Sequence, residues 1–400
     1  MSDPRFDVSI AEIARALRFA KKDERGRRNN VVLVGAGASI SAGIPGAADI
    51  GRRLVRLVAE RFDIACTANA EASEVYAILE SQHMLDDCRI AAASRSKAPE
   101  DREIDWWRVY DQVFKRYYTQ PNDVRDLFGS LVDEAGGAIN WAHLVLGELV
   151  ARGIISTVLT TNFDQLALSG LARAGIIPVV CDGLESLNRI AGAPRHPQLI
   201  EIHGSRHSYL LRNSPVDVSS VRGASPAIAA IRSLIQYAHA LVVVGYGGRE
   251  DGVMDLLVEA AEAYPYKHLY WVLHGSNIDT LSEKARKLLS TTHNGGVLVN
   301  YDADKLFLEL SRELGVGGPR VISDPLAMVE AYLKAAGSAR INHADIQAQL
   351  DEAFRRLATL RSAASLESDH ATAAANEIRR LRLSGDLKGA YELASRELHK

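Results

Sequence analysis

The sequence predicts an α/β fold: a Rossmann-like, doubly wound parallel sheet with a helical insertion and a C-terminal all-helical extension. Short apolar runs recur along the first 300 residues, and helical patterns separate most of them, as in parallel sheets with helices on both faces. Residues 47–150 are mostly helical in pattern and interrupt this alternation. After about residue 322 the chain is rich in Ala, Leu, Glu and Arg without a strand-like run, which indicates helices alone.

The individual elements follow from the hydrophobic patterns. Residues 8–20 have helical spacing and lead into a first strand at Val31–Val34. Five further apolar runs have the length and composition of buried parallel strands. They are Ile154–Thr160, Gln198–Ile202, Leu241–Val244, His268–Leu273 and Gly296–Asn300. Ligands of such sheets bind beyond the carboxyl ends of the strands, so the residues directly after each run are the candidates for function.

The length of 400 residues exceeds a typical single domain. We expect one domain over residues 1–320, with residues 47–150 as its helical insertion, and a helical C-terminal region over residues 321–400. The last segment has the pattern of a helix, a Ser-Gly-Asp turn and a second helix. One such pair cannot bury its own apolar face, so it either packs on the helices before it or starts a tetratricopeptide-like repeat array.

Composition excludes several classes of protein. Hydrophobic residues make up 47% and charged residues 24% of the chain, values that are ordinary for a soluble globular protein. The formal net charge of -3 gives no reason to expect direct nucleic-acid binding. No apolar run approaches a membrane span, and the N-terminus lacks a secretory apolar region. The three cysteines, Cys66, Cys88 and Cys181, are few and far apart, which favours the reducing cytoplasm over a disulfide scaffold.

A glycine-rich loop, "GAGASISAGIP" at residues 35–45, follows the first strand. Glycines after a buried strand let backbone N–H groups approach a ligand, and a helix starting there would favour a phosphate. The dinucleotide fingerprint would place a third glycine at position 40, where this chain has Ile40, and no Gly-Lys-Ser/Thr ending is present. Taken alone, the loop is either a phosphate cradle or a tight turn between a strand and a helix.

Polar or glycine-rich segments also follow four later strands. "TTNFD" contains Asn162 and Asp164, "IHG" contains His203, "VGYGG" contains Gly245 and Tyr246, and "LVNYD" contains Asn300. Each of these residues has an ordinary alternative explanation, because Asn, Asp and Gly are common in turns and caps and a single His is often structural. Their shared position after predicted parallel strands nevertheless indicates one site at one edge of the sheet.

In order and approximate spacing, these segments resemble the motifs of the sirtuin superfamily over about residues 25–315. The loop "GAGASISAGIP" is similar to its first glycine motif, and "TTNFD", "IHG", "VGYGG" and "LVNYDADKLF" are similar to its later motifs. The resemblance implies that residues 1–320 form an NAD-binding catalytic domain. The implied catalytic residues are Asn162, His203 and Asp164. The implied NAD+-binding residues are Gly35, Ala36, Gly37, Ser39, Gly43, Gly245, Tyr246 and Asn300.

The chain departs from the protein deacylases of that superfamily. Those enzymes carry two Cys-x-x-Cys pairs that hold a structural zinc, whereas residues 205–244 here contain no cysteine. The acidic-aromatic-Arg segment after the first glycine motif is replaced by Gly-Ala-Ala-Asp at residues 46–49. These features are similar to the zinc-free, sirtuin-like domains of bacterial anti-phage defence proteins. We therefore expect NAD+ as a substrate and no bound metal.

The resemblance implies an NAD+ glycohydrolase that releases nicotinamide and ADP-ribose and depletes NAD+ in abortive infection. An enzyme with this effect needs control, so we expect a homo-oligomer, an activating partner protein or a phage-derived trigger. Two alternatives stay open at this point. One is a zinc-free NAD-dependent protein deacylase or ADP-ribosyltransferase, and the other is a non-catalytic module that senses NAD or ADP-ribose.

Overall fold

The computed structural model divides into two compact units, Met1–Pro319 and Arg320–Lys400, and each is described on its own. The residues that the structure describes are 8–66, 72–88, 104–117, 121–134, 138–182, 186, 189–205, 225–248, 252–292, 294–337, 344–383 and 386–398.

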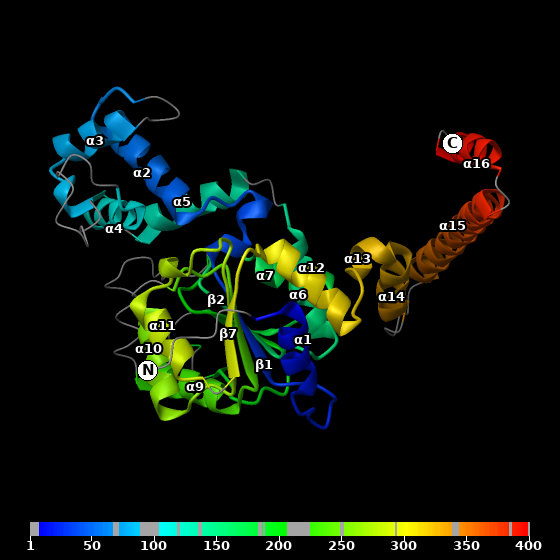
Figure 1. The fold of residues 1–400 in the computed structure, drawn as a ribbon, viewed down its shortest axis with the longest axis horizontal. Coiled ribbons are helices and arrows are strands. Elements are labelled where there is room, and N and C mark those ends of the chain that lie inside the picture. The colour runs from blue at the N-terminus through cyan, green and yellow to red at the C-terminus, as the bar shows by residue number, and fades with distance from the viewer. Residues whose placement is uncertain are drawn as a thin grey trace. The chain divides into compact units, whose positions relative to one another are not determined.

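The first unit is built on a seven-stranded sheet in which all adjacent strands are parallel (Figure 1). The strand order is β3-β4-β2-β1-β5-β6-β7. The strands are β1 (Asn30–Val34), β2 (Thr157–Thr160), β3 (Val179–Asp182), β4 (Gln198–Glu201), β5 (Ala240–Val244), β6 (His268–Val272) and β7 (Asn294–Leu298). The doubly wound parallel sheet that the sequence predicts is confirmed.

Helices cover both faces of this sheet (Figure 1). Alternate residues of a strand point to opposite faces, so Val31 and Leu33 join one core cluster while Val32 and Val34 join the other. The helices packed on the first of these clusters are α9 (Ser225–Tyr237), α10 (Gly252–Ala263) and α11 (Glu283–Ser290). The helices packed on the second are α1 (Ile10–Phe19), α6 (Trp141–Ala151), α7 (Leu166–Arg173) and α12 (Ala303–Leu314).

A helical insertion separates β1 from β2, as the sequence predicts. It consists of α2 (Ala47–Arg61), α3 (Ala72–Ser81), α4 (Trp106–Tyr117) and α5 (Pro121–Glu134). These helices share a third core cluster, which includes Leu54, Ile78, Val113 and Phe128. The insertion therefore has apolar packing of its own, and Figure 1 shows its helices gathered beside the body that holds the sheet.

The structure differs from the predicted elements at β3 and after β1. The sequence analysis misses β3, because this edge strand is only four residues long and is partly exposed, so it lacks the continuous apolar pattern of a buried strand. Inside the glycine-rich loop the backbone forms two 3₁₀ turns, at Ala36–Ala38 and Ile40–Ala42, which the sequence analysis does not predict. The helix that follows the loop begins at Ala47, where the predicted helical pattern also begins.

The second unit consists of helices α13 (Arg320–Ser323), α14 (Pro325–Gly337), α15 (Ala344–Leu383) and α16 (Leu387–Leu398). The helix α16 packs on α15, with Ala390 buried and with Leu387 and Tyr391 exposed. The start of a repeat array in this region stays a prediction. Within the described ranges, none of the helices combines the length and the apolar character needed to cross a membrane.

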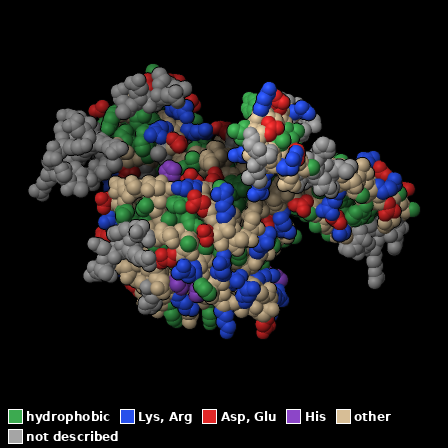
Figure 2. Space-filling model, turned by 45° about the vertical axis from the view of Figure 1, so that its right-hand side comes forward, with side chains coloured by type: hydrophobic (Ala, Val, Ile, Leu, Met, Phe, Trp, Pro, Cys, Tyr) green, Lys and Arg blue, Asp and Glu red, His purple; other side chains and the backbone are tan. Residues whose placement is uncertain are grey.

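Basic and acidic side chains are interspersed on the face of the molecule drawn in Figure 2. This mixture agrees with the formal net charge of -3 of the chain.

Candidate active site

The carboxyl ends of four central strands lie level with one another. Val34 of β1 is in register with Thr160 of β2 and with Val244 of β5, and Thr160 is in register with Glu201 of β4. Each of these motifs begins either at this row or one residue beyond it. The parallel register therefore brings the first glycine motif, "TTNFD", "IHG" and "VGYGG" to the same edge of the sheet.

The strand order places the two glycine-rich segments at the reversal point of the sheet. The chain builds β2, β4 and β3 on one side of β1, and then β5, β6 and β7 on the other. Ligands of doubly wound proteins bind where the winding direction changes, which in this sheet is beyond the ends of β1 and β5. We call residues 35–45 the first glycine loop and residues 245–248 the second glycine loop.

The two glycine loops pack directly on each other. The Gly35 N–H donates to the Val244 carbonyl at 2.9 Å, and the Gly37 N–H donates to the Gly245 carbonyl at 2.8 Å. A Cβ added at Gly35 would lie 2.5 Å from the Tyr246 Cα, closer than non-bonded atoms approach. The predicted residues Gly35, Gly37 and Gly245 thus allow the loops to meet, and the N–H groups of Gly35 and Gly37 are used in that contact.

Other residues of the first glycine loop face different surroundings. Ala36 is exposed, and Ser39 is fully buried beneath the loop. Gly43 ends the second 3₁₀ turn in the left-handed conformation, with a φ of 87°, which a glycine adopts without strain. Because Gly35 and Gly37 are engaged with the second loop, a ligand at this edge would meet the exposed backbone at Ala36.

Asn162 connects the end of β2 to the first glycine loop. Its Nδ2 donates to the Gly35 carbonyl and to the Ser39 Oγ, both at 3.1 Å. The side chain is buried, and within the part of the chain that the structure describes its Oδ1 has no hydrogen-bond partner. A buried acceptor is normally satisfied, so this oxygen is a candidate contact for a ligand.

Asp164 lies two residues further on, just before α7. Its Oδ1 accepts a hydrogen bond of 2.9 Å from the Leu166 N–H, and Gln165 between them has a φ of 56°. The ordinary role of an Asp after a strand, an Asx turn that starts a helix, is therefore present here. One carboxylate oxygen of Asp164 serves this turn.

His203 lies at the same edge, beside the segment that carries Asn162 and Asp164. Its ring stacks on Phe163 with the ring centroids 6.1 Å apart, and Phe163 in turn lies 4.7 Å from Phe128 of α5. His203 is mostly buried, at 9% exposure. The structure thus brings "TTNFD" and "IHG" together and connects both to the helical insertion through Phe163.

Two residues that the sequence analysis misses, Asn140 and His143, support the first glycine loop from α6. The Asn140 Nδ2 donates to the Ala38 carbonyl at 2.6 Å and to the Ser41 Oγ at 2.7 Å. Its Oδ1 lies 2.5 Å from the His143 Nδ1. Burial lowers the pKa of His143, although the nearby carboxylates of Asp164 and Asp304 oppose that shift. An Asn directly before a helical pattern is a helix-cap signal that could have indicated Asn140.

Glu201, the last residue of β4, is another buried group that the sequence analysis misses. Only 2% of it is exposed. Burial, Asp182 and Asp164 together raise the pKa of its carboxyl to about 7, and a hydrogen bond with Ser205 acts in the opposite direction. A carboxylic acid with this pKa retains its proton far more often at neutral pH than an exposed glutamate does.

Tyr246 and Asn300 lie away from this group. The Tyr246 ring packs in the sheet core, 6.0 Å from the Trp271 ring, so its side chain supports the second glycine loop from below. Asn300 is exposed, has a φ of 62°, and donates its N–H to the Gly275 carbonyl. It follows β7, three strands from β1, which corresponds to roughly 14 Å across the sheet. The structure does not bring Asn300 to the residues around Asn162.

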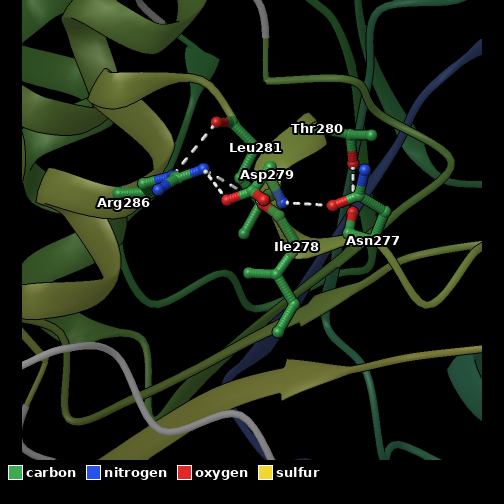
Figure 3. Close-up of polar contacts among 6 residues, drawn as sticks. All are labelled: Asn277, Ile278, Asp279, Thr280, Leu281 and Arg286. Carbon is green, nitrogen blue, oxygen red and sulfur yellow. Dashed lines mark hydrogen bonds and ion pairs between the residues drawn. The ribbon is translucent and has the colours of Figure 1, made fainter.

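The loop after β6 lies between these two regions of the edge and is held by its own polar contacts (Figure 3). The Asn277 Oδ1 accepts from the Asp279 N–H at 2.9 Å, and the Arg286 Nη2 of α11 lies 3.1 Å from the Asp279 Oδ1. The Ser282 hydroxyl at the start of α11 donates to the Gly248 carbonyl of the second glycine loop. These contacts anchor one end of that loop to α11.

The described ranges contain no cluster of three or more His, Cys, Asp or Glu side chains placed to bind a metal ion.

Glycine-rich loops that meet at the reversal point of a doubly wound sheet define the class of nucleotide-binding α/β proteins. A family model described as SIR2-like domain matches residues 156–294, which include Asn162, Asp164, His203 and Gly245. Residues 156–294 are therefore similar in sequence to SIR2-like domains. This similarity supports an NAD-binding, sirtuin-like enzyme.

Two solved Sir2 structures are also similar to this chain. One contains a Sir2 variant with a deacetylated p53 peptide and 3′-O-acetyl ADP ribose. Its sequence is 15% identical to this chain, and the TM-score is 0.36. The matched region covers 78% of this chain and 100% of the Sir2 chain. The other, titled for the mechanism and regulation of Sir2 enzymes, is 14% identical, has a TM-score of 0.37, and covers 78% and 98%. The similarity to SIR2-like domains rests on the family model and not on these two likenesses. No curated protein matches the chain significantly.

Proposed function

We propose that this protein is an NAD+ glycohydrolase that cleaves NAD+ to nicotinamide and ADP-ribose. The observation that carries the proposal is the Asn162 amide, whose Nδ2 is held by the first glycine loop. Its buried Oδ1 has no partner among the described residues, which suits an acceptor for a sugar hydroxyl. The similarity to SIR2-like domains supports NAD+ as the substrate.

The residues around Asn162 suit the parts of a dinucleotide. The exposed backbone at Ala36 and the Ser39 hydroxyl would lie nearest the pyrophosphate, in a loop shaped by Gly35, Gly37 and Gly43. His203 would contact the ribose hydroxyls, and the second oxygen of Asp164 would bind the nicotinamide carboxamide. Gly245 and Tyr246 would shape the adenosine side. Asn300 is the weakest of these assignments, because it lies at the far edge of the sheet.

The proposed reaction breaks the bond between ribose C1′ and the nicotinamide nitrogen. The bonding electron pair goes to the nitrogen, so the cationic ring leaves as neutral nicotinamide and oxocarbenium character develops on the ribose. A water oxygen then bonds to C1′, and its proton passes to His203 as the general base. The Asn162 amide and the loop dipoles would stabilise the developing charge in a site that excludes most water.

Water is the proposed acceptor because the chain lacks the cysteine pairs that hold zinc in related deacylases. Without that module, a cleft for an acylated peptide has no evident support. We further propose that the enzyme acts in the cytoplasm as an anti-phage effector that depletes NAD+. Homo-oligomerisation, a partner protein or a phage-derived trigger would control it, since constant activity would kill the cell.

The test is to incubate the purified chain with NAD+, with and without lysate of phage-infected cells, and to separate the products by chromatography. We expect nicotinamide and ADP-ribose in equal amounts. Asn162→Ala and His203→Ala should each slow nicotinamide release by about 100-fold or more. The matched controls are Asn294→Ala and His196→Ala. Both residues are exposed and lie at the amino ends of strands, away from the candidate site: Asn294 begins β7, and His196 lies two residues before β4.

Two results would overturn the proposal. An unchanged rate in both site variants would remove Asn162 and His203 from the reaction. Consumption of NAD+ only when an acylated peptide or an acceptor protein is added would identify a deacylase or an ADP-ribosyltransferase instead.

A further inference from the structure

Glu201 is buried at the edge of the sheet that carries the candidate site. Acidic side chains are rarely this buried unless a cation pairs with them. Glu201 of β4 is instead in register with Thr160 of β2 on one side and with Asp182 of β3 on the other. Its Oε2 has no hydrogen-bond partner within the described part of the chain. A group that is costly to bury is thus retained directly beneath the candidate site.

Glu201 contacts both residues that follow His203. Its carbonyl accepts a hydrogen bond of 3.0 Å from the Gly204 N–H, which closes a tight turn with His203 at the third position. Its carboxyl forms a side-chain hydrogen bond with Ser205, one residue further on. Gly204 has a φ of 82°, so a glycine suits this position. Both the backbone and the side chain of Glu201 therefore hold the segment that presents the imidazole.

The charges around Glu201 favour its neutral form. Asp182 faces it from β3 and Asp164 faces it from the segment after β2, and both carboxylates raise the pKa of the Glu201 carboxyl. From α6, His143 lies beside Asp164, and burial lowers the pKa of that imidazole. No cation compensates a Glu201 carboxylate among these groups, so the side chain fits its place best when it carries a proton.

We propose that Glu201 is a positioning residue for His203, whose buried carboxyl holds Ser205 and keeps the turn at residues 201–204 in the shape that presents the imidazole. The inference rests on the proposed function, in which His203 contacts the ribose. The inference also predicts that the arrangement depends on pH. Loss of the Glu201 proton places a third carboxylate beside Asp182 and Asp164, and the resulting repulsion disturbs the turn.

The experiment compares wild type with Glu201→Gln and Glu201→Ala. Glutamine keeps the shape and the hydrogen bond but cannot ionise, whereas alanine removes both. We expect kcat for nicotinamide release to fall by about 10-fold or more in Glu201→Ala with KM little changed, because a misplaced base slows the chemical step. Glu201→Gln should keep a kcat close to wild type at pH 6. It should also lose the decline that wild type shows as the pH rises through about 7.

A second measurement does not depend on catalysis. The ring resonance of His203, assigned with a His203→Asn variant, should show an additional inflection near pH 7 in wild type as Glu201 ionises, and Glu201→Gln should remove it. Gln198→Leu is the control, since Gln198 is a buried polar residue at the other end of β4. It should lower stability without changing the resonance or the pH profile.

The outcomes separate the two proposals. If wild type releases no nicotinamide but Glu201→Gln removes the inflection of His203, the proposed function fails while the positioning role stands. If Glu201→Gln keeps the wild-type pH profile and the wild-type His203 titration, the positioning role is overturned whatever the activity.

Discussion

Asn162 uses both donors of its amide within the protein, and its acceptor Oδ1 has no partner among the residues that the structure describes. The two donated hydrogen bonds, to Gly35 and Ser39, hold the side chain at the first glycine loop. Asn140 holds the same loop from the other side through Ala38 and Ser41. The loop therefore depends on polar side chains from β2 and α6 as well as on its own turns.

At the scale of single residues, Gly35 should tolerate no side chain. A Cβ there would lie 2.5 Å from the Tyr246 Cα, and neither backbone can move without separating the two glycine loops. We expect Gly35→Ala to lower the free energy of unfolding by about 1–3 kcal/mol and to abolish nicotinamide release. Denaturant unfolding and product chromatography measure the two effects.

The control for this substitution is Gly46→Ala, where the added Cβ would meet only Ile40 Cδ1 at 3.8 Å. That change should alter stability by no more than about 0.5 kcal/mol. Equal stability and equal activity of the two variants would contradict the close packing of the loops.

Glu201 should make stability depend on pH in a specific direction. Its pKa is raised from 4.5 to about 7 in the folded chain, so folding binds its proton more tightly. The stability that this proton provides is complete below pH 4.5 and is lost as the pH rises to about 7. The shift corresponds to roughly 3 kcal/mol.

Denaturant unfolding of wild type and Glu201→Gln between pH 5 and pH 8 measures this effect. Wild type should lose stability relative to the variant as the pH rises. Parallel stability curves over this range would show that Glu201 ionises like an exposed carboxyl.

At the scale of elements, the helical insertion reaches the candidate site through one pair of aromatic rings. Phe128 of α5 contacts Phe163, and Phe163 stacks on His203. Phe163 also packs against the core of the insertion. A substitution within α5 can therefore alter the position of the His203 ring, although α5 does not contact the substrate itself.

Phe128→Leu tests this connection. Loss of the ring contact should cost about 1 kcal/mol of stability and should slow nicotinamide release several-fold, since His203 loses the support behind Phe163. Leu131→Val, in the same helix and the same core, should cost a similar amount of stability and leave the rate unchanged. Equal rates in the two variants would contradict a role for the insertion at the site.

The sequence could predict those elements that have a continuous pattern. The buried strands β1 and β5 are continuous apolar runs, and the sequence predicts them with nearly the correct bounds. The sequence does not predict the edge strand β3, because this strand exposes part of its surface and has no such run. The helix after the first glycine loop begins at Ala47, as its pattern predicts, whereas the two 3₁₀ turns within the loop are too short to have a recognisable period.

The residues of the candidate site also differ in whether the sequence predicts them. Asn162 and His203 follow strands, so the parallel sheet brings them to one edge, and that placement could be predicted. The sequence does not identify His143 and Glu201 as part of the site, because their importance depends on packing between distant segments. Asn140 has a helix-cap signal, but that signal indicates the start of α6 and not the contact with the first glycine loop. Asn300 follows a predicted strand, but the strand order, which the sequence does not reveal, places it at the far edge.

At the scale of the whole molecule, the chain separates into a sheet-containing unit and a helical unit. All the residues of the candidate site belong to the first unit, so the proposed chemistry needs only residues before 320. The second unit exposes large apolar side chains on α16, at Leu387 and Tyr391. Control of the enzyme by assembly or by a partner stays a proposal for that unit.

The central claim is that the first glycine loop, Asn162 and His203 bind one dinucleotide. A crystal structure of the Asn162→Ala variant soaked with NAD+ tests it most directly, because slowed cleavage should leave the substrate intact. We expect the pyrophosphate at Ala36 and Ser39 and the nicotinamide ribose within hydrogen-bond distance of His203. Density for NAD+ anywhere else on the chain, with this edge of the sheet empty, would contradict the claim.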